Sequence, residues 1–501
     1  MTVGSPGMLL TLLLVLGGRI LAGLETPLAD SYRAAVYEHN VSFPRHRDVV
    51  PRLEALQLME ENLGKFDEQA RQAAQQKAKI IVFPEYGVYG LGWTRQKLAP
   101  FLEYIPDPAG NPWNPCDNPN GFVSAVQTLL SCIAKNNSIY VVANIGSQQP
   151  CISTDKSCPS DHVYQFNTNV VYDPRGIFIA RYFKYNLDSV EMQYFDRPPV
   201  VNHTIFDTPF GRFATVCSND ILYKEPTLTL VKTMNITNLA MPAAWKEELP
   251  LMSAIEFHSA FAEGLLINVL AANLHVVDLG YYGSGLYWPT GTSINASYFY
   301  DDDPYSEGSL VVETLTPSII PSDVWDPPQF TENKRFAPRR LVNNAEQSSL
   351  THKIKINGDI YTAKVFKFGE AYSANVCQGS LCCDADFEGG ASGDMFAFGA
   401  FEGMHSGNNS YYLQSCALIK CAGRTVESCG QPTKHTSTGI DKMSMSGNFS
   451  YPYQFPEVFT VGDHPEIVTQ IWYYQGSVII DVGLYGDLLT VAIQAIDYSR
   501  Q

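Results

Sequence analysis

The sequence predicts an α/β domain with reactive side chains at its strand ends, followed by a second, mainly β domain that disulfides hold together. Residues 32–85 have the pattern of a strand, a helix and a strand, which is the β-α-β unit of an α/β sandwich. Two further apolar runs end abruptly, one at Lys184 and one at the Cys217-Ser218 pair. From about Ser306 the helical periodicity disappears, and the remainder alternates strand-like runs with Gly-rich turns.

Length and charge limit the possible functions. A chain of 501 residues with 45% apolar residues is long enough for two cores. Its net charge of −17 disfavours nucleic acid or an anionic membrane surface as a partner, because either would need a basic face. We therefore expect neither as a partner.

The elements of the first domain follow from periodicity and turn chemistry. Residues 32–37 alternate loosely and predict a strand, and residues 51–76 carry apolar side chains at helical spacing with a proline at the start, where a missing N–H costs nothing. This helix leads to the strand that ends at Glu85, and residues 90–117 predict a long loop over the site. Further strands are predicted at 138–145, 169–172, 177–183, 238–241 and 266–272, and a helix at 250–264.

The second domain begins where prolines crowd the chain after residue 310. We expect a signal peptide at 1–23, the α/β domain at 24–310 and the β domain at 311–501. Strands in the last segment are predicted at 353–356, 361–366, 468–474 and 477–482.

The first residues indicate export. An apolar run at 8–16 is followed by a small-residue site near Ala22-Gly23, which is typical of a secretory signal peptide. The last apolar run, 488–496, is short and interrupted, so a C-terminal lipid anchor is not expected. Seven glycosylation sequons agree with a secreted glycoprotein; they begin at Asn40, Asn136, Asn202, Asn235, Asn295, Asn408 and Asn448.

Eleven cysteines in an exported protein should mostly be paired, and the odd count leaves one thiol over. Spacing predicts the local pairs Cys116 with Cys132 and Cys151 with Cys158. Cys217 is the cysteine without a neighbour, so we expect it to be free. An even group of six lies near the C-terminus, at Cys377, Cys382, Cys383, Cys416, Cys421 and Cys429.

The polar residues at the three strand ends suggest acyl transfer. A thiol enzyme that cleaves amides needs a nucleophile, a base and a positive group near the developing oxyanion, and Cys217, Glu85 and Lys184 supply these groups. Each residue type alone is more common in a structural role, as a cap, a solvated lysine or a small core residue. The histidines show no metal-ligand spacing, so no metal is expected.

Seven motifs carry a family resemblance. They read IIVFPEYGVYG, SIYVVANIG, FNTNVVYDPRG, ARYFKYNL, FDTPFGRF, MPAAWKEELPLMSAIEFHSAFA and GSGLY, with the Cys382-Cys383 pair near the end. The chain thereby resembles the vanin (pantetheinase) and biotinidase branch of the nitrilase superfamily. This resemblance implies an αββα nitrilase-type domain with a C-terminal base domain, and hydrolysis of a pantetheine- or biotin-type linear amide without a cofactor. By motif, Glu85 is similar to the family's general base and Lys184 to its oxyanion-stabilising lysine.

The nucleophile departs from that pattern. In this branch the corner reads Thr-Cys-Phe-Asp-Ile-Leu, and ungapped matching puts Ser218, not Cys217, at the cysteine position. Neighbouring residues on a strand point to opposite faces, so the offset would turn Cys217 away from Glu85. Either the corner is rebuilt around Cys217, or the amidase is largely disabled, because a carboxylate is a poor base for an alcohol.

A second function fits the displaced thiol. The branch also includes the symplectin photoproteins, which hold dehydrocoelenterazine through a cysteine thioether and emit light. By this resemblance the partner would be a chromophore. The attachment site would be either Cys217 or Cys421, the latter lying near Lys420 and Arg424 in a basic patch that favours a thiolate.

Overall fold

The computed structural model describes residue 1 and residues 31–44, 48–110, 113–119, 124–152, 154–290, 293–317, 350–369, 371–406, 410–462, 465–468, 472–474, 477–480 and 486–501. The expected signal peptide, most of the proline-rich stretch after residue 317 and the sequon at Asn408 lie outside these residues. In the described residues no helix is long and apolar enough to cross a membrane.

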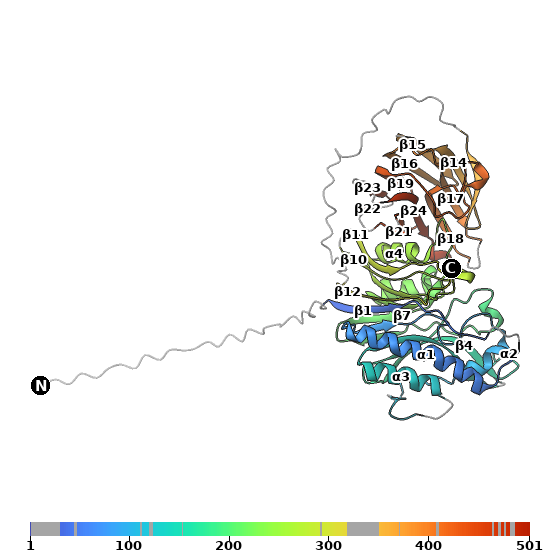
Figure 1. Ribbon diagram of the computed structural model, residues 1–501, viewed down its shortest axis with the longest axis vertical. Coiled ribbons are helices and arrows are strands. Elements are labelled where there is room, and N and C mark those ends of the chain that lie inside the picture. Colours follow the sequence, from blue (N-terminus) through green and yellow to red (C-terminus); the bar gives the residue numbers. More distant parts are fainter. Residues whose placement is uncertain are drawn as a thin grey trace.

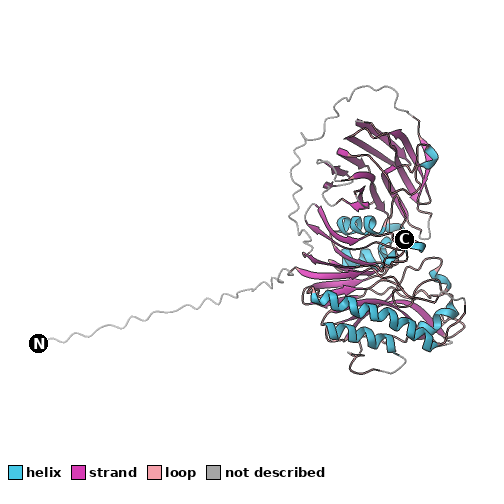
Figure 2. Ribbon diagram, in the orientation of Figure 1, coloured by secondary structure: helices cyan, strands magenta, loops and turns pink. Residues whose placement is uncertain are grey.

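The first part of the chain forms four layers, with two six-stranded sheets packed face to face between helices (Figure 1, Figure 2). The helices are α1 (Arg52–Gln75), α2 (Arg95–Leu98), α3 (Ala125–Asn137) and α4 (Ala254–Leu265). The sequence analysis did not identify α3. The short helical segments within the described residues include η1 (Ala99–Phe101), η3 (Glu191–Gln193), η4 (Ser218–Leu222), η5 (Lys224–Thr233), η6 (Val277–Leu279), η8 (Val426–Ser428) and η9 (Tyr498–Arg500).

The first sheet has the order β12-β1-β2-β3-β4-β5, and its three strands β1, β2 and β3 run parallel. The strands are β12 (Leu310–Leu315), β1 (Tyr32–Tyr37), β2 (Ile80–Val82), β3 (Tyr140–Pro150), β4 (Val163–Tyr172) and β5 (Phe178–Phe183). Helix α1 covers this sheet with its apolar face, where Phe66 stacks on Phe83 with ring centroids 4.0 Å apart. Because β12 pairs with β1, the first sheet extends past the boundary expected at residue 310.

The second sheet has the order β11-β10-β9-β8-β7-β6. Its strands are β11 (Ser293–Phe299), β10 (Ser284–Thr290), β9 (Asn268–Ala272), β8 (Asn238–Pro242), β7 (Gly211–Thr215) and β6 (Ile205–Thr208). An apolar layer joins the two sheets, in which Tyr32 of the first meets Phe213 of the second with centroids 5.6 Å apart. The apolar run 227–231 lies in the helical segment η5.

The C-terminal domain is two β-sheets around their own apolar core. The larger has the order β13-β14-β17-β18-β24-β20-β21 and the smaller β15-β16-β19-β23-β22. The larger contains β13 (His352–Ile356), β14 (Asp359–Lys367), β17 (Met395–Met404), β18 (Tyr412–Lys420), β24 (Asp487–Ile496), β20 (Tyr453–Val461) and β21 (Pro465–Ile467). The smaller contains β15 (Ala371–Gln378), β16 (Leu381–Gly389), β19 (Ile440–Gly447), β23 (Ser477–Ile480) and β22 (Trp472–Tyr474).

Helix α4 joins the two domains, because it covers the second sheet and also packs on β20 of the C-terminal domain (Figure 1). Phe455 of β20 stacks on Phe261 with centroids 5.5 Å apart. At Gly264 the backbones come so close that a Cβ there would lie 2.3 Å from the Gln454 carbonyl oxygen. The junction is therefore a continuous apolar core.

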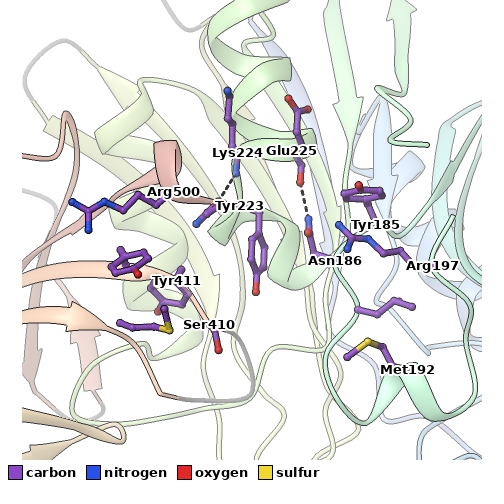
Figure 3. Close-up of a pocket in the computed structure, with 14 residues that line it drawn as sticks. Tyr185, Asn186, Met192, Arg197, Tyr223, Lys224, Glu225, Ser410, Tyr411 and Arg500 are labelled. Carbon is purple, nitrogen blue, oxygen red and sulfur yellow. Dashed lines mark hydrogen bonds between the residues drawn. The ribbon is translucent and has the colours of Figure 1, made fainter. Parts of the chain in front are cut away.

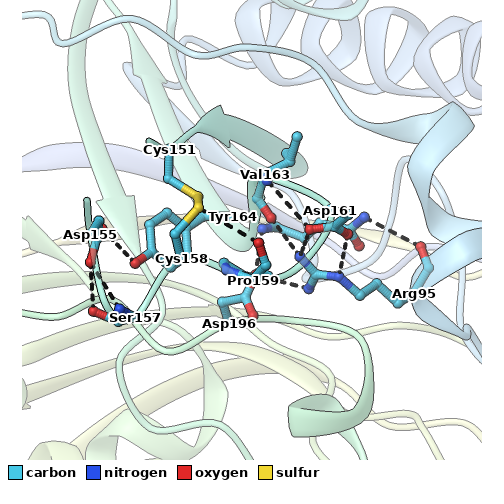
Figure 4. Close-up of a disulfide and its surroundings, with 11 residues drawn as sticks. Arg95, Cys151, Asp155, Ser157, Cys158, Pro159, Asp161, Val163, Tyr164 and Asp196 are labelled. Carbon is cyan, nitrogen blue, oxygen red and sulfur yellow. Dashed lines mark hydrogen bonds and ion pairs between the residues drawn. A yellow bond between two sulfur atoms is a disulfide. The ribbon is translucent and has the colours of Figure 1, made fainter. Parts of the chain in front are cut away.

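Five disulfides confirm the predicted cysteine pairing. The local pairs Cys116–Cys132 and Cys151–Cys158 form, and Cys217 is free and buried. The Cys151–Cys158 bridge closes the tip between β3 and β4, beside Arg95, which ion-pairs with Asp161 and Asp196 (Figure 4). The six C-terminal cysteines pair as Cys377–Cys382, Cys383–Cys416 and Cys421–Cys429.

Candidate active site

The three predicted strand ends meet between the two sheets. Glu85 follows β2, Lys184 follows β5, and Cys217 and Ser218 follow β7. All four side chains are buried. The Lys184 ammonium nitrogen lies 2.9 Å from Glu85 Oε1, so the structure brings together a base and a cation that are about one hundred residues apart in the sequence.

A second carboxylate, Glu191, completes this cluster, and the sequence analysis missed it. Its two carboxylate oxygens lie 2.9 and 2.8 Å from Lys184 Nζ, and it accepts a hydrogen bond of 2.5 Å from the Tyr86 hydroxyl. Glu191 starts η3 in the segment after Lys184, where an acidic residue also reads as a helix-start signal. The sequence therefore offered no pattern that separates this buried partner from an ordinary cap.

Burial and the charges within this cluster shift the pKa values of its three ionisable side chains. Burial acts to lower the pKa of Lys184, but Glu191 and Glu85 outweigh it and raise that pKa well above its usual value. Burial raises the pKa of Glu85 despite the opposing lysine, and the nearby Glu191 charge raises it further. Burial also acts to raise the pKa of Glu191, but Lys184 outweighs it and lowers that pKa. Lys184 is thus held charged, while Glu85 can take up a proton more readily than an exposed carboxylate, as a general base must.

Buried asparagines hold the carboxylates in place. The Asn167 amide donates to Glu85 Oε1 over 2.6 Å and to Glu191 Oε1 over 3.1 Å. The amide of Asn144 donates to Asn167 over 2.5 Å. Satisfied buried amides of this kind fix side-chain positions in a low-dielectric interior.

The corner after β7 has the geometry of a nucleophile elbow, and Ser218 stands at its tip. Ser218 has φ of +40°, a left-handed conformation that non-glycine residues rarely adopt. The Asp220 carboxylate accepts the backbone N–H of Cys217 at 3.0 Å and so caps the short helix η4. Burial raises the pKa of Asp220 to about 6.

The two candidate nucleophiles have different hydrogen-bond partners in the buried cluster. Ser218 Oγ accepts the Ala244 N–H at 2.7 Å, and the same N–H lies 3.1 Å from Glu85 Oε2. Cys217 Sγ lies 3.7 Å from the Asn144 amide nitrogen, on the side of the buried asparagines. Burial first, and then the Glu85 charge, raise the pKa of Cys217 well above its usual value, so the thiol is neutral.

An open cavity of about 570 Å³ lies at the domain junction, next to the elbow (Figure 3). Tyr223 and Asn186 line it from the first domain, and Tyr411 and Arg500 from the second. Asn186 connects the cavity to the elbow, because its amide donates to Asp220 Oδ1 over 2.8 Å. The lining does not include Glu85, Lys184, Cys217 or Ser218.

The remaining predicted residues lie outside the cluster. Cys421 is bridged to Cys429, which corrects its proposed role as a thioether site, because a disulfide sulfur has no thiol to offer. Among the described sequons, Asn136, Asn202, Asn235 and Asn448 are exposed, and Asn40 and Asn295 are partly buried. The described residues contain no group of three or more His, Cys, Asp or Glu placed to hold a metal ion.

Four layers around a buried lysine and its carboxylates place the first domain among the carbon–nitrogen hydrolases. The family described as Carbon-nitrogen hydrolase matches residues 56–258, and the one described as Vanin C-terminal domain matches residues 350–500. The chain belongs to the vanin (pantetheinase) and biotinidase family of amidohydrolases, which confirms the resemblance carried by its motifs and the fold class expected from it.

The relatives match over most of their length. Mouse (Mus musculus) pantetheinase is 40% identical over 439 residues, which cover 87% of this chain and 83% of the relative. Human (Homo sapiens) pantetheinase is 39% identical and is covered to 82%, with 86% of this chain matched. Rat (Rattus norvegicus) biotinidase is 37% identical over an alignment of 506 positions, gaps included, which covers 96% of this chain and 95% of the relative.

Proposed function

We propose that this protein is an amidohydrolase for linear amides of the pantetheine or biotin type, in which Ser218 stands in the nucleophile's place and turnover is therefore slow. The observation that carries the proposal is the orientation of the elbow. Ser218 Oγ accepts the Ala244 N–H, which also lies 3.1 Å from Glu85 Oε2. Cys217 Sγ instead contacts the amides of Asn144 and Asn167. The hydroxyl therefore shares a hydrogen-bond donor with the base, and the thiol does not.

The proposed steps use only residues of the cluster. Glu85 takes the Ser218 proton as Oγ attacks the amide carbonyl, and the Lys184 ammonium stabilises the oxyanion. Glu85 then gives the proton to the departing amine, the C–N bond breaks, and an ester remains on Ser218. Glu85 next takes a proton from water as the water oxygen attacks the ester carbonyl. The bond from that carbon to Ser218 Oγ breaks, the acid leaves, and Glu85 returns the proton to Ser218 Oγ.

The weak step is the first one. An alcohol holds its proton far more tightly than a thiol, and here a carboxylate takes the place of the histidine that activates serine in other hydrolases. Cys217 does not remedy this, because burial and the Glu85 charge raise the pKa of its thiol and a thiolate is the reactive species.

The test is to assay pantetheine and biotinyl amides with the natural protein and with Ser218→Cys. We expect Ser218→Cys to raise kcat/KM on the order of 10²- to 10⁴-fold, which corresponds to about 3 to 5.5 kcal/mol of barrier. Cys217→Ser is the matched control, since it makes the reverse exchange of sulfur for oxygen one residue away, and it should leave turnover unchanged.

Three outcomes would overturn the proposal. Loss of turnover in Cys217→Ser would show that the elbow works through the thiol. A kcat/KM of the natural protein equal to that of Ser218→Cys would show that the serine does not slow the reaction. Absence of turnover in every variant on both substrate classes would refute the proposal that the protein is an amidase for these substrates.

We also propose export and glycosylation as the setting of this activity. Five disulfides suit an oxidising compartment, and four sequon asparagines are exposed. A secreting cell that expresses the protein should release it into the medium. Enzymatic removal of glycans from the secreted protein should then lower its mass measurably. Protein retained in the cell without glycans would contradict this. No observation on the described residues favours the chromophore function.

A further inference from the structure

The residues that follow β24 bind the helix that carries the nucleophile elbow. Tyr498 donates its hydroxyl to the Ile221 carbonyl over 3.0 Å. The Gln501 side chain donates to the Leu222 carbonyl over 3.0 Å and accepts the Lys224 N–H at 2.8 Å. Three hydrogen bonds thus connect the end of the C-terminal domain to residues 221–224.

These bonds meet a specific need of the elbow. Helix η4 is a single short turn of five residues, and a helix this short leaves its last carbonyl groups without partners of its own. The carbonyls of Ile221 and Leu222 are two of these. At the other end of η4, Asp220 already caps the Cys217 N–H. The turn that presents Ser218 is therefore held at its start by its own domain and at its end by the other domain.

Packing and backbone hydrogen bonds hold Tyr498 in place, whereas Gln501 is exposed. Tyr498 and Gln501 follow β24, which lies between β18 and β20 within the seven-stranded sheet. The Asp497 N–H bonds the Tyr412 carbonyl at 3.0 Å, and Tyr498 is 3% exposed. A side chain fixed in this way can restrain the elbow, because a strained φ such as that of Ser218 persists only where the surrounding structure imposes it.

We propose that Tyr498 and Gln501 are positioning residues for the elbow. Through their hydrogen bonds to the end of η4, the C-terminal domain holds Ser218 in its left-handed conformation. The catalytic consequence rests on the proposed function. The structural consequence does not, because Cys217 is a buried free thiol inside the same turn and reports its opening directly.

The experiment measures how fast a thiol reagent labels Cys217 in the native protein. Tyr498→Phe and Gln501→Ala should each speed this labelling on the order of fivefold, the effect of losing one or two hydrogen bonds that hold the turn closed. Gln501→Glu, which keeps the acceptor for Lys224 and loses the donor to Leu222, should fall between Gln501→Ala and the natural protein.

Two controls separate local from global effects. Arg500→Gln changes the neighbouring residue, which ion-pairs with Asp497 and stacks on Tyr412, and should leave the labelling rate unchanged. Tyr453→Phe removes the hydroxyl of the tyrosine that packs against Tyr498 and should also do so. Denaturation midpoints of all variants show whether faster labelling merely follows global unfolding.

The catalytic arm uses the Ser218→Cys background, where kcat should fall on the order of fivefold in Gln501→Ala with KM within about twofold. Equal labelling in all variants, or labelling that rises only in step with the loss of global stability, would overturn the inference. If no variant turns over amide, the proposed function fails, while the labelling result still decides the role of the C-terminal residues.

Discussion

Replacing Lys184 by methionine tests whether the buried cluster is held together by charge. The side chain is 3% exposed and is the shared cation of Glu85 and Glu191. Removing one partner of a buried ion pair typically costs about 3 to 5 kcal/mol, since an uncompensated charge is left behind. At about 2 °C per kcal/mol for a domain of this size, Lys184→Met should lower the thermal midpoint by roughly 6 to 10 °C at pH 7.5.

The pH dependence of this loss follows from the pKa shifts. Lys184 lowers the pKa of Glu191 below 4.5, so the attraction stabilises the fold above pH 4.5 and is lost as pH falls through the folded-state pKa. Lys184 has a raised pKa, so its contribution persists up to its unfolded value of 10.5. In the variant, burial is no longer opposed by the lysine and raises the pKa of both carboxyls, so they take up protons as the pH falls and the charge imbalance disappears. The midpoint difference at pH 4 should therefore be less than half of that at pH 7.5.

Circular dichroism melts of the natural protein, Lys184→Met and Lys79→Met at both pH values would measure this. Lys79 precedes β2 and is exposed, so Lys79→Met removes the same charge from the surface and should shift the midpoint by less than about 2 °C. A loss of equal size at pH 4 and pH 7.5, or an equal loss in Lys79→Met, would refute the charge argument.

Three further experiments test other parts of the structure. Glu191→Gln removes a charge that raises the pKa of Glu85, so the acid limb of kcat/KM for Ser218→Cys should move to lower pH; a limb that stays in place would contradict the coupling. Gly264→Ala would place a Cβ 2.3 Å from a backbone oxygen, whereas Gly64→Ala in α1 meets nothing within 4 Å. The first should destabilise by about 1 to 3 kcal/mol and the second stabilise by up to about 1 kcal/mol, as urea midpoints would show; the same sign for both would contradict the packing. A thiol label applied to the unreduced protein in urea should appear on Cys217 alone, and in native buffer only slowly; label on any other cysteine would contradict the disulfide pattern.

Local patterns in the sequence were sufficient for several features of this protein. Apolar runs that end in Glu85 and Lys184 located the strand ends, because a strand and the polar residue that follows it are adjacent in the sequence. Short spacing predicted the Cys151–Cys158 pair, since a closed loop of few residues keeps two cysteines within bonding distance. The period of two along a strand predicted that moving the thiol by one residue gives it different neighbours from those of Ser218, and the two side chains do have different hydrogen-bond partners.

Tertiary structure alone decided the features that join distant segments. Glu191 reads as a helix-start residue, and only the fold puts it against Lys184. The turn after Ser218 is hydrogen-bonded by Tyr498 and Gln501, which lie more than 270 residues away and have no local signature. Hydrogen bonds and ion pairs of this kind depend on where whole sheets dock, and docking depends on the shape of buried apolar surfaces, which residue order encodes only through the complete fold.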